Sequence, residues 1–141
     1  MAIKHITKTK GDLGVGKVIS DILSNNMQVC LPIGEHLPFD LIAVSETGVL
    51  KRIQIKYRKI VNGAIQVPLS TANSSGRMPY DLNMIDVFAI FCPDNEKIYY
   101  INVNEMKTTA WFSIRIEPSK NRQNKKIRLA TTYEDINRIY K

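Results

Sequence analysis

The sequence has two cysteines, one tryptophan and no long apolar run. Cys30 and Cys92 form no C-x-x-C pair and are too sparse for a disulfide scaffold. Because each lies in an apolar stretch, we expect two buried, reduced thiols and no disulfide or zinc site. No apolar segment approaches the ~20 residues of a membrane span, and residues 1–10 lack the apolar core of a signal peptide. We therefore expect a cytoplasmic protein without a membrane partner.

The 141 residues, of which 44% are hydrophobic and 8% aromatic, suffice for one core and little more. No repeat, linker or low-complexity tract divides the sequence. A two-domain arrangement would need two undersized cores. We therefore expect a single domain over residues 1–141.

Acidic residues are outnumbered. Twenty Lys and Arg oppose thirteen Asp and Glu, which gives a net charge of +7. Such an excess favours a polyanionic partner through counterion release. The basic residues cluster at 4–10, at 51–59 and, most densely, in the C-terminal segment at about 117–130. The alternative interpretation is a solvated face that keeps the protein soluble.

Hydrophobic periodicity predicts a mixed set of elements. Residues 12–25 have apolar positions at helical spacing and should form an amphipathic helix that ends at Asn25 and Asn26. Asn62-Gly63 is a two-residue hairpin signal. Residues 70–81 are the longest polar, turn-rich segment, which we expect to be a loop that contacts DNA. Strands are predicted at 27–33, 39–44, from 49 to 58, 64–69, 87–92, 97–103 and 111–116, with a helical turn at 104–106 and a helix at 133–140.

Gly11, Gly14 and Gly16 only weakly match a phosphate-binding loop. No apolar strand precedes them, and no G-K-S or G-K-T follows. Close packing of the helix against a sheet explains them better. We therefore expect no nucleotide cofactor.

A carboxylate, an amide and an ammonium are predicted to meet on two neighbouring strands. Asp40 begins one apolar strand, and Gln54 and Lys56 lie on one face of the next. Asp40, Gln54 and the backbone carbonyl of Ile55 could bind one hard divalent cation, Mg²⁺ or in its place Mn²⁺, with Lys56 pointing at the same cavity. Such a site suits phosphodiester hydrolysis. Alternatively, Gln54 and Lys56 are two polar residues on the solvated side of an antiparallel strand.

These residues resemble the motif of the PD-(D/E)XK nuclease superfamily. Pro38-Phe39-Asp40 corresponds to the P-D element, and Gln54-Ile55-Lys56 corresponds to (D/E)-X-K, with Gln in place of the second acid. The resemblance implies an α/β (α+β) restriction-endonuclease-like core with a mixed central β-sheet flanked by helices. It extends to G-E-x-x-P-F-D, to I-D-V-F-A-I-F at 85–91 and to N-R-Q-N-K-K-I-R-L-A at 121–130. Together these are similar to small single-domain endonucleases that include a cyanobacterial group I intron homing endonuclease.

The resemblance also points to an acid on the first helix. Many members carry a K-G-E-like pattern near the N-terminus, and Lys10-Gly11-Asp12 matches it with an acid one methylene shorter. Asp12 would then complete the metal shell as a further catalytic residue. The alternative for Asp12 is an ordinary helix N-cap.

The expected function is that of a metal-dependent endonuclease acting on double-stranded DNA, with a homing endonuclease as the favoured kind. One site cuts one strand, so a homodimer or homotetramer is expected. The alternatives are a Holliday-junction resolvase, a restriction-type nuclease and a catalytically inactive DNA-binding module of the same fold. The residues expected to contact DNA are Lys10, Arg58, Asn73, Ser74, Ser75, Arg77, Lys120, Arg122, Gln123, Lys125, Lys126 and Arg128.

Overall fold

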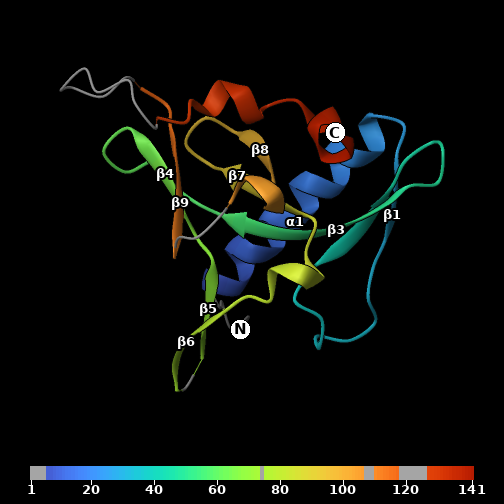
Figure 1. Ribbon diagram of the computed structural model, residues 1–141, viewed down its shortest axis with the longest axis horizontal. Helices are drawn as coiled ribbons and strands as arrows, with labels where there is room; N and C mark the ends of the chain where they lie inside the picture. The colour runs from blue at the N-terminus through green and yellow to red at the C-terminus, as the bar shows by residue number, and fades with distance from the viewer. Residues whose placement is uncertain (1–5, 74, 107–109, 118–126) are drawn as a thin grey trace, which may run out of the picture.

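A five-stranded mixed sheet forms the centre of the structure, a computed structural model that describes residues 6–73, 75–106, 110–117 and 127–141 (Figure 1). The strand order is β1-β2-β3-β7-β8. β3 and β7 are parallel, and the other neighbouring pairs are antiparallel. The expected mixed sheet is therefore present. Its strands are β1 (Gln28–Cys30), β2 (Leu41–Val44), β3 (Leu50–Tyr57), β7 (Val87–Cys92) and β8 (Lys97–Asn102).

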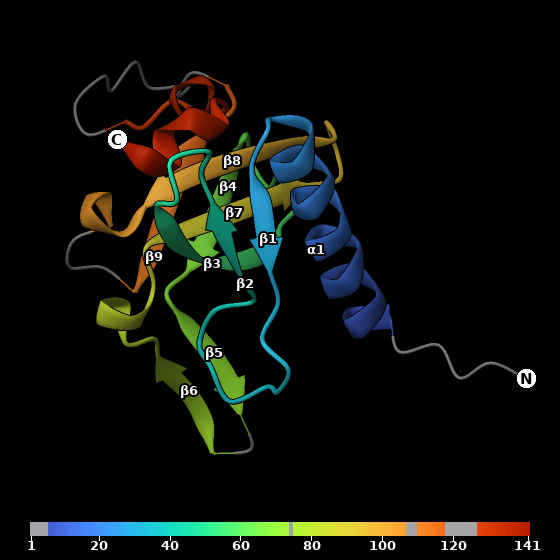
Figure 2. The same cartoon turned by 90° about the vertical axis from the view of Figure 1, so that its right-hand side faces the viewer.

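Helix α1 (Ile6–Ser24) packs along one face of this sheet (Figure 2). Gly14, Val18 and Ile22, spaced four residues apart, are its buried residues. A Cβ atom on Gly14 would lie 3.6 Å from Ile55 Cγ2, an ordinary contact distance, so Gly14 faces the sheet at a point where an alanine would also fit. The close-packing explanation does not hold for Gly11 and Gly16, because a Cβ atom there would meet nothing within 4 Å.

The predicted end of the helix is confirmed, but its predicted start is wrong. Asn26 adopts a left-handed φ of 60°, a conformation that ends helices. At the other end the helix begins at Ile6 instead of Asp12. Residues 6–10 are all exposed, so no apolar periodicity marks them. Asp12 therefore lies inside the helix and is not its N-cap.

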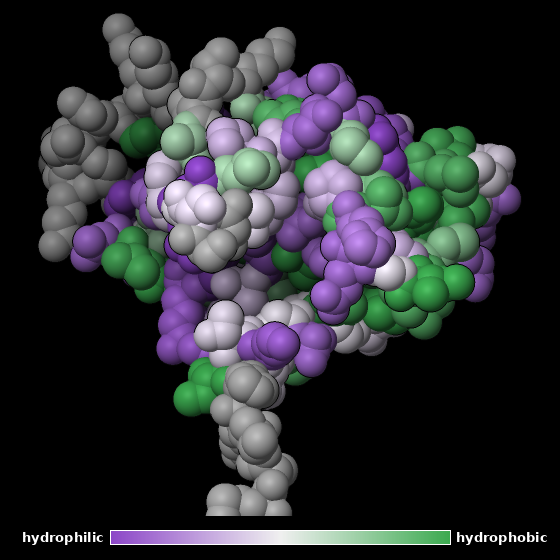
Figure 3. Space-filling view, turned by 90° about the horizontal axis from the view of Figure 1, so that it is seen from below, coloured by the Kyte–Doolittle hydropathy of each residue, from purple (hydrophilic) through white to green (hydrophobic). Residues whose placement is uncertain are grey.

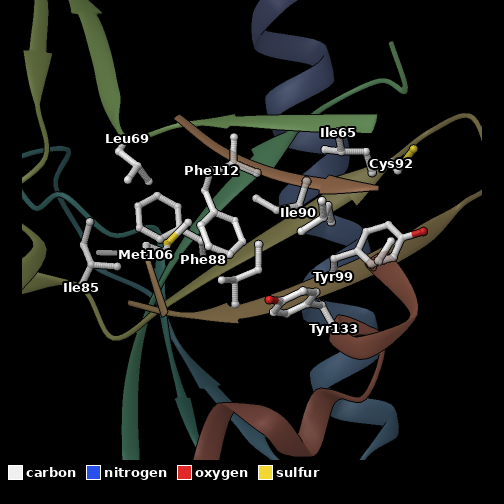
Figure 4. Close-up of a cluster of buried hydrophobic side chains, with 14 residues drawn as sticks. Ile65, Leu69, Ile85, Phe88, Ile90, Cys92, Tyr99, Met106, Phe112 and Tyr133 are labelled. Atoms are coloured by element: carbon white, nitrogen blue, oxygen red, sulfur yellow. The ribbon is translucent and has the colours of Figure 1, made fainter. Parts of the chain in front are cut away.

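A two-stranded ribbon of β4 (Ala64–Pro68) and β9 (Trp111–Arg115) covers the other face. The larger apolar cluster fills the space between this ribbon and the sheet (Figure 4). Phe88 and Ile90 of β7 meet Ile65 and Phe112 of the ribbon there. Because both faces of β7 are covered, all six of its residues are buried, as its near-continuous apolar sequence requires.

Residues 70–81 form a β-hairpin and a short turn, not the predicted loop. β5 (Ser70–Asn73) and β6 (Gly76–Pro79) pair only with each other, and the hairpin projects away from the layers (Figure 1). Every residue of β6 is exposed, which explains why no hydrophobic alternation marked these strands. The hairpin leads through Tyr80 into η1 (Leu82–Met84).

Two further predictions, on the cysteines and on the Asn62-Gly63 hairpin, need correction. Cys92 is buried, as predicted, but Cys30 is exposed because β1 is a short edge strand. The Asn62-Gly63 turn is present with φ of 52° and 74°, yet β4 pairs with β9 and meets the preceding chain only at Val61.

The C-terminal segment contains two 3₁₀ helices, η3 (Ala130–Tyr133) and η4 (Ile136–Tyr140), instead of one helix at 133–140. Asp135 is extended between them, and its carboxylate accepts a hydrogen bond from the N–H of Asn137. The expected turn at 104–106 is η2 (Val103–Glu105). None of the helices in the described part of the chain is long and apolar enough to cross a membrane.

An ion pair joins β3 to the start of β7. Asp86 Oδ2 accepts hydrogen bonds from the Arg52 N–H at 2.8 Å and from Nε at 3.0 Å, and Oδ1 accepts one from Nη2 at 3.0 Å. These donors hold the pKa of Asp86 below its usual value, against the opposing effect of burial. A depressed carboxyl pKa adds stability that is fully present above the unfolded-state pKa of about 4 and is lost as the pH falls through the folded-state pKa.

We expect Asp86→Asn to lower the free energy of unfolding at pH 7 by about 1 kcal/mol, because the charge-assisted hydrogen bonds are lost at a half-exposed site. Urea unfolding of wild type and variant should show this difference shrinking below about pH 4. Glu46→Gln is the matched control, since Glu46 is exposed and makes no hydrogen bond within the described residues. A difference that stays constant down to pH 2 would contradict the assignment.

Candidate active site

β2 and β3 pair as far as Leu41 and Ile53 and then separate at Asp40. The Asp40 N–H donates to the Ile53 carbonyl at 2.8 Å, and its carboxylate Oδ2 accepts the Ile55 N–H at 2.7 Å. The carboxylate thus replaces the next strand partner of β3. In a strand, the N–H and C=O of one residue point to the same edge, so the Ile55 carbonyl also faces this fork.

Gln54 and Lys56 share one face of β3, as predicted. Their register partners on β7 are Phe88 and Ile90, which point toward the β4–β9 ribbon. Ile53 and Ile55 point the other way, into the cluster beneath α1. The Gln54 Nε2 lies 3.4 Å from the Ile55 carbonyl oxygen and donates to it. The three predicted oxygen donors therefore gather at the fork.

Lys56 has a partner that sequence reasoning missed. Its Nζ donates a hydrogen bond to the Tyr80 hydroxyl at 2.5 Å and lies 4.7 Å from the centroid of the Tyr80 ring. The ring in turn packs edge-on against Phe88, with centroids 5.8 Å apart. Tyr80, the residue directly after β6, therefore lies over β3. No local pattern marks this pair, because 24 residues of sequence separate Tyr80 from Lys56.

Burial raises the pKa of the Asp40 carboxyl above its usual value, while the Ile55 N–H and the Lys56 charge act to lower it. A nearby cation would stabilise the charged form of such a partly buried carboxylate. Its Oδ1 accepts no hydrogen bond from the described residues and is open to a ligand.

The donor set fits a hard divalent cation. Asp40 offers a carboxylate oxygen, Ile55 a carbonyl, and Gln54 an amide oxygen once its amide is turned over. The site is poor in charge, since the described residues contain no group of three His, Cys, Asp or Glu side chains able to hold a metal. Asp40 supplies the acid at the fork.

Asp12 is not brought to the other residues by any contact. It is exposed, its side chain makes no hydrogen bond within the described part of the chain, and it lies on α1, which packs on the sheet face opposite to Gln54 and Lys56. The proposal that Asp12 completes the metal shell therefore rests on the resemblance of Lys10-Gly11-Asp12 to the nuclease superfamily pattern, because no contact among the described residues supports it.

Two of the residues expected to contact DNA lie together beside the only tryptophan of the sequence. The sequence did not indicate this grouping. The Arg58 and Arg77 Cζ atoms lie 5.9 and 5.6 Å from the centroid of the Trp111 ring. Elsewhere, Lys10 and Ser75 are exposed, and Asn73 ends β5.

Arg128 is exposed, and its Cζ lies 4.3 Å from the ring centroid of Phe112. The other residues expected to contact DNA lie outside the described residues: Ser74, Lys120, Arg122, Gln123, Lys125 and Lys126.

The structure also contains a hollow of about 690 Å³ between the end of α1, the β2–β3 turn and η4. It is lined mainly by polar residues, among them Asn25, Thr47 and Asn137. None of the predicted site residues lines it, so its size does not make it the candidate active site.

A mixed sheet, with an antiparallel pair that opens at an aspartate opposite a Q-x-K strand, defines a nuclease of the restriction-endonuclease-like fold. The chain belongs to the PD-(D/E)XK endonuclease family, whose model matches residues 5–136.

Two solved structures are similar to it. A bacterial homing endonuclease, I-Ssp6803I, superposes with a TM-score of 0.70 at 25% identity, over 91% of this chain and 88% of the other. Hjc, a Holliday junction resolvase from the archaeal hyperthermophile Archaeoglobus fulgidus, gives a TM-score of 0.58 at 13% identity, over 92% and 94%. No curated protein sequence matches the chain significantly.

Proposed function

We propose that this protein is a single-domain, Mg²⁺-dependent endonuclease that hydrolyses phosphodiester bonds in double-stranded DNA. The observation that carries the proposal is the position of the Asp40 carboxylate at the fork. It accepts a hydrogen bond from the Ile55 N–H, and the nearby Lys56 charge acts to lower its pKa. Membership of the endonuclease family supports the reaction class.

The roles follow from the positions of the donors. Asp40, Gln54 and the Ile55 carbonyl hold Mg²⁺, which Mn²⁺ can replace. Such a cation supplies an activated water and stabilises charge on the phosphate group in the transition state. Lys56, oriented by the Tyr80 hydroxyl, presents a positive charge beside the same carboxylate and meets the phosphate from the ribbon side of the sheet.

Among the possible substrates we favour an intact duplex cut at a specific site, as expected of a homing endonuclease. The similarity to I-Ssp6803I is higher in sequence identity and in TM-score than the similarity to the resolvase, which concerns the fold alone. Incubation of the protein with a four-way junction and with a linear duplex of matched sequence separates these roles. Preferential cutting of the junction would favour the resolvase alternative.

We expect Lys56→Ala and Asp40→Asn each to reduce Mg²⁺-dependent nicking of supercoiled plasmid at least about 100-fold, since each removes a group that acts on the reacting phosphate or its cation. Gel-shift affinity for DNA should change only a few-fold. Lys59→Ala is the matched control, because this exposed lysine lies outside the site. Equal nicking by wild type and Lys56→Ala would indicate contamination and favour an inactive DNA-binding module.

Asp12→Asn tests the helix acid separately. If Asp12 supplies a second charge to the cation, the Mg²⁺ concentration for half-maximal nicking should rise about tenfold or more. Asp135→Asn removes an equal charge from an exposed helix cap and serves as the control. An unchanged Mg²⁺ dependence would remove Asp12 from the shell and leave Asp40 as its only acid.

Cleavage of both strands requires two copies of the single site, so we propose a homodimer or a homotetramer. The apolar residues that remain exposed support this, because several of them lie in the segments that follow the edge strand β1 and connect β2 to β3. Figure 3 shows hydrophobic side chains gathered toward the side of the molecule where β1 lies. The exposed apolar residues of this region are Leu31, Ile33 and Leu37, in the segment between β1 and β2, and Val49 and Leu50, where the β2–β3 turn enters β3.

Ile33→Asp should lower the molar mass measured by size-exclusion chromatography with light scattering, because a charge placed in this apolar patch opposes association. Val61→Asp is the control, since Val61 is also apolar and exposed but lies at the turn before β4. An unchanged mass for both variants would place the interface elsewhere.

A further inference from the structure

A recess of about 490 Å³ lies beside Lys56, between the β5–β6 hairpin, the start of β9 and η1. Its lining is mainly apolar, and Leu69 and Met106 form a buried floor. The size is in the range of small-molecule binding sites. The apolar lining residues are Leu69, Pro79, Tyr80, Leu82, Met106 and Trp111.

Two cations stand at the edge of this recess without counter-ions. Arg77 Nε donates to Ser70 Oγ at 2.8 Å, and Arg58 Nε donates to the Gln66 carbonyl at 2.8 Å, so both bind neutral oxygens. Within the described residues no carboxylate pairs with either guanidinium. Burial and the Arg77 charge together lower the pKa of Arg58. Two uncompensated like charges this close favour an anion.

The recess is continuous with the proposed active site. Tyr80 lines it, and the same Tyr80 hydroxyl accepts the hydrogen bond from Lys56. Trp111 lies on the other side with 46% of its surface exposed. A nucleotide bound here would therefore adjoin the phosphate that Lys56 meets.

Apolar walls and an aromatic ring have no complement in a paired duplex, whose outer surface is anionic backbone. The largest apolar surface in DNA is the face of a base, which becomes available when the base leaves the stack. The guanidinium groups match the phosphates of the same strand.

We propose that this recess binds one unstacked nucleotide next to the bond that is cut, with the base against Trp111 and the apolar wall and its phosphate on Arg58 and Arg77. This assignment rests on the proposed nuclease function and specifies its substrate: DNA in which one nucleotide beside the cleavage point leaves the helix.

Trp111 is the only tryptophan in the chain, so intrinsic fluorescence reports directly from this recess. The Asp40→Asn protein is titrated with an eight-nucleotide oligothymidylate and with an abasic deoxyribose-phosphate oligomer of equal length and charge. We expect the oligothymidylate to quench the fluorescence and to bind about tenfold more tightly, since stacking adds to the phosphate contacts. Equal affinity and equal quenching for both oligomers would overturn the base site.

Arg77→Ala should weaken binding of the oligothymidylate about tenfold, whereas Lys59→Ala, which removes the same charge from the residue next to Arg58, should change it little. Equal effects of both variants would overturn the phosphate assignment. Plasmid nicking by the wild type is measured in parallel. Nicking without base-dependent quenching refutes the recess alone, and base-dependent quenching without nicking refutes the nuclease proposal alone.

Discussion

The hydrogen bond between the Ile55 N–H and the Asp40 carboxylate occupies the point where two strands part. Without it, β3 would leave a half-buried N–H without a partner, at a cost comparable to that of a lost hydrogen bond. The same bond sets the position of the acid relative to β3. Because Gln54 and Ile55 are neighbours on that strand, all three oxygen donors are then placed by one local feature of the sheet.

The sheet separates packing from chemistry by face. Ile53 and Ile55 point toward α1 and join its apolar cluster, whereas Gln54 and Lys56 point toward the ribbon side. Polar side chains can be held there because Tyr80 covers Lys56 with both a hydroxyl and a ring. The β5–β6 hairpin, which adds no strand to the central sheet, thus shapes the site through the residue that follows it.

Much of this arrangement could be predicted from the sequence, because alternation and turn chemistry are local. The faces of β3 and the continuous burial of β7 are confirmed, whereas at Asn62-Gly63 the turn is present without the predicted pairing of the flanking strands. The hairpin at 70–79 was not predicted, because exposed strands that pair only with each other show no hydrophobic pattern. The helix start at Ile6 was also not predicted, because residues 6–10 are exposed and show no apolar periodicity.

The parts of the site that could not be predicted depend on long-range contacts. The Tyr80 bond to Lys56 and the two arginines around Trp111 join residues far apart in sequence, and no local pattern marks such pairs. Nor could the sequence show that α1 lies on the face opposite to Lys56. The resemblance identified Asp12, but only the structure shows that this residue is exposed on the helix that packs against the opposite face.

Gly14 has a consequence for any attempt to redesign this protein. Position 14 faces β3 and β7, with room for one methyl group at ordinary contact distance. Bulkier residues there would lift the whole helix from the sheet and carry Asp12 with it. Position 14 thus governs the spacing between α1 and the fork from inside the core, where it is remote from DNA and from solvent.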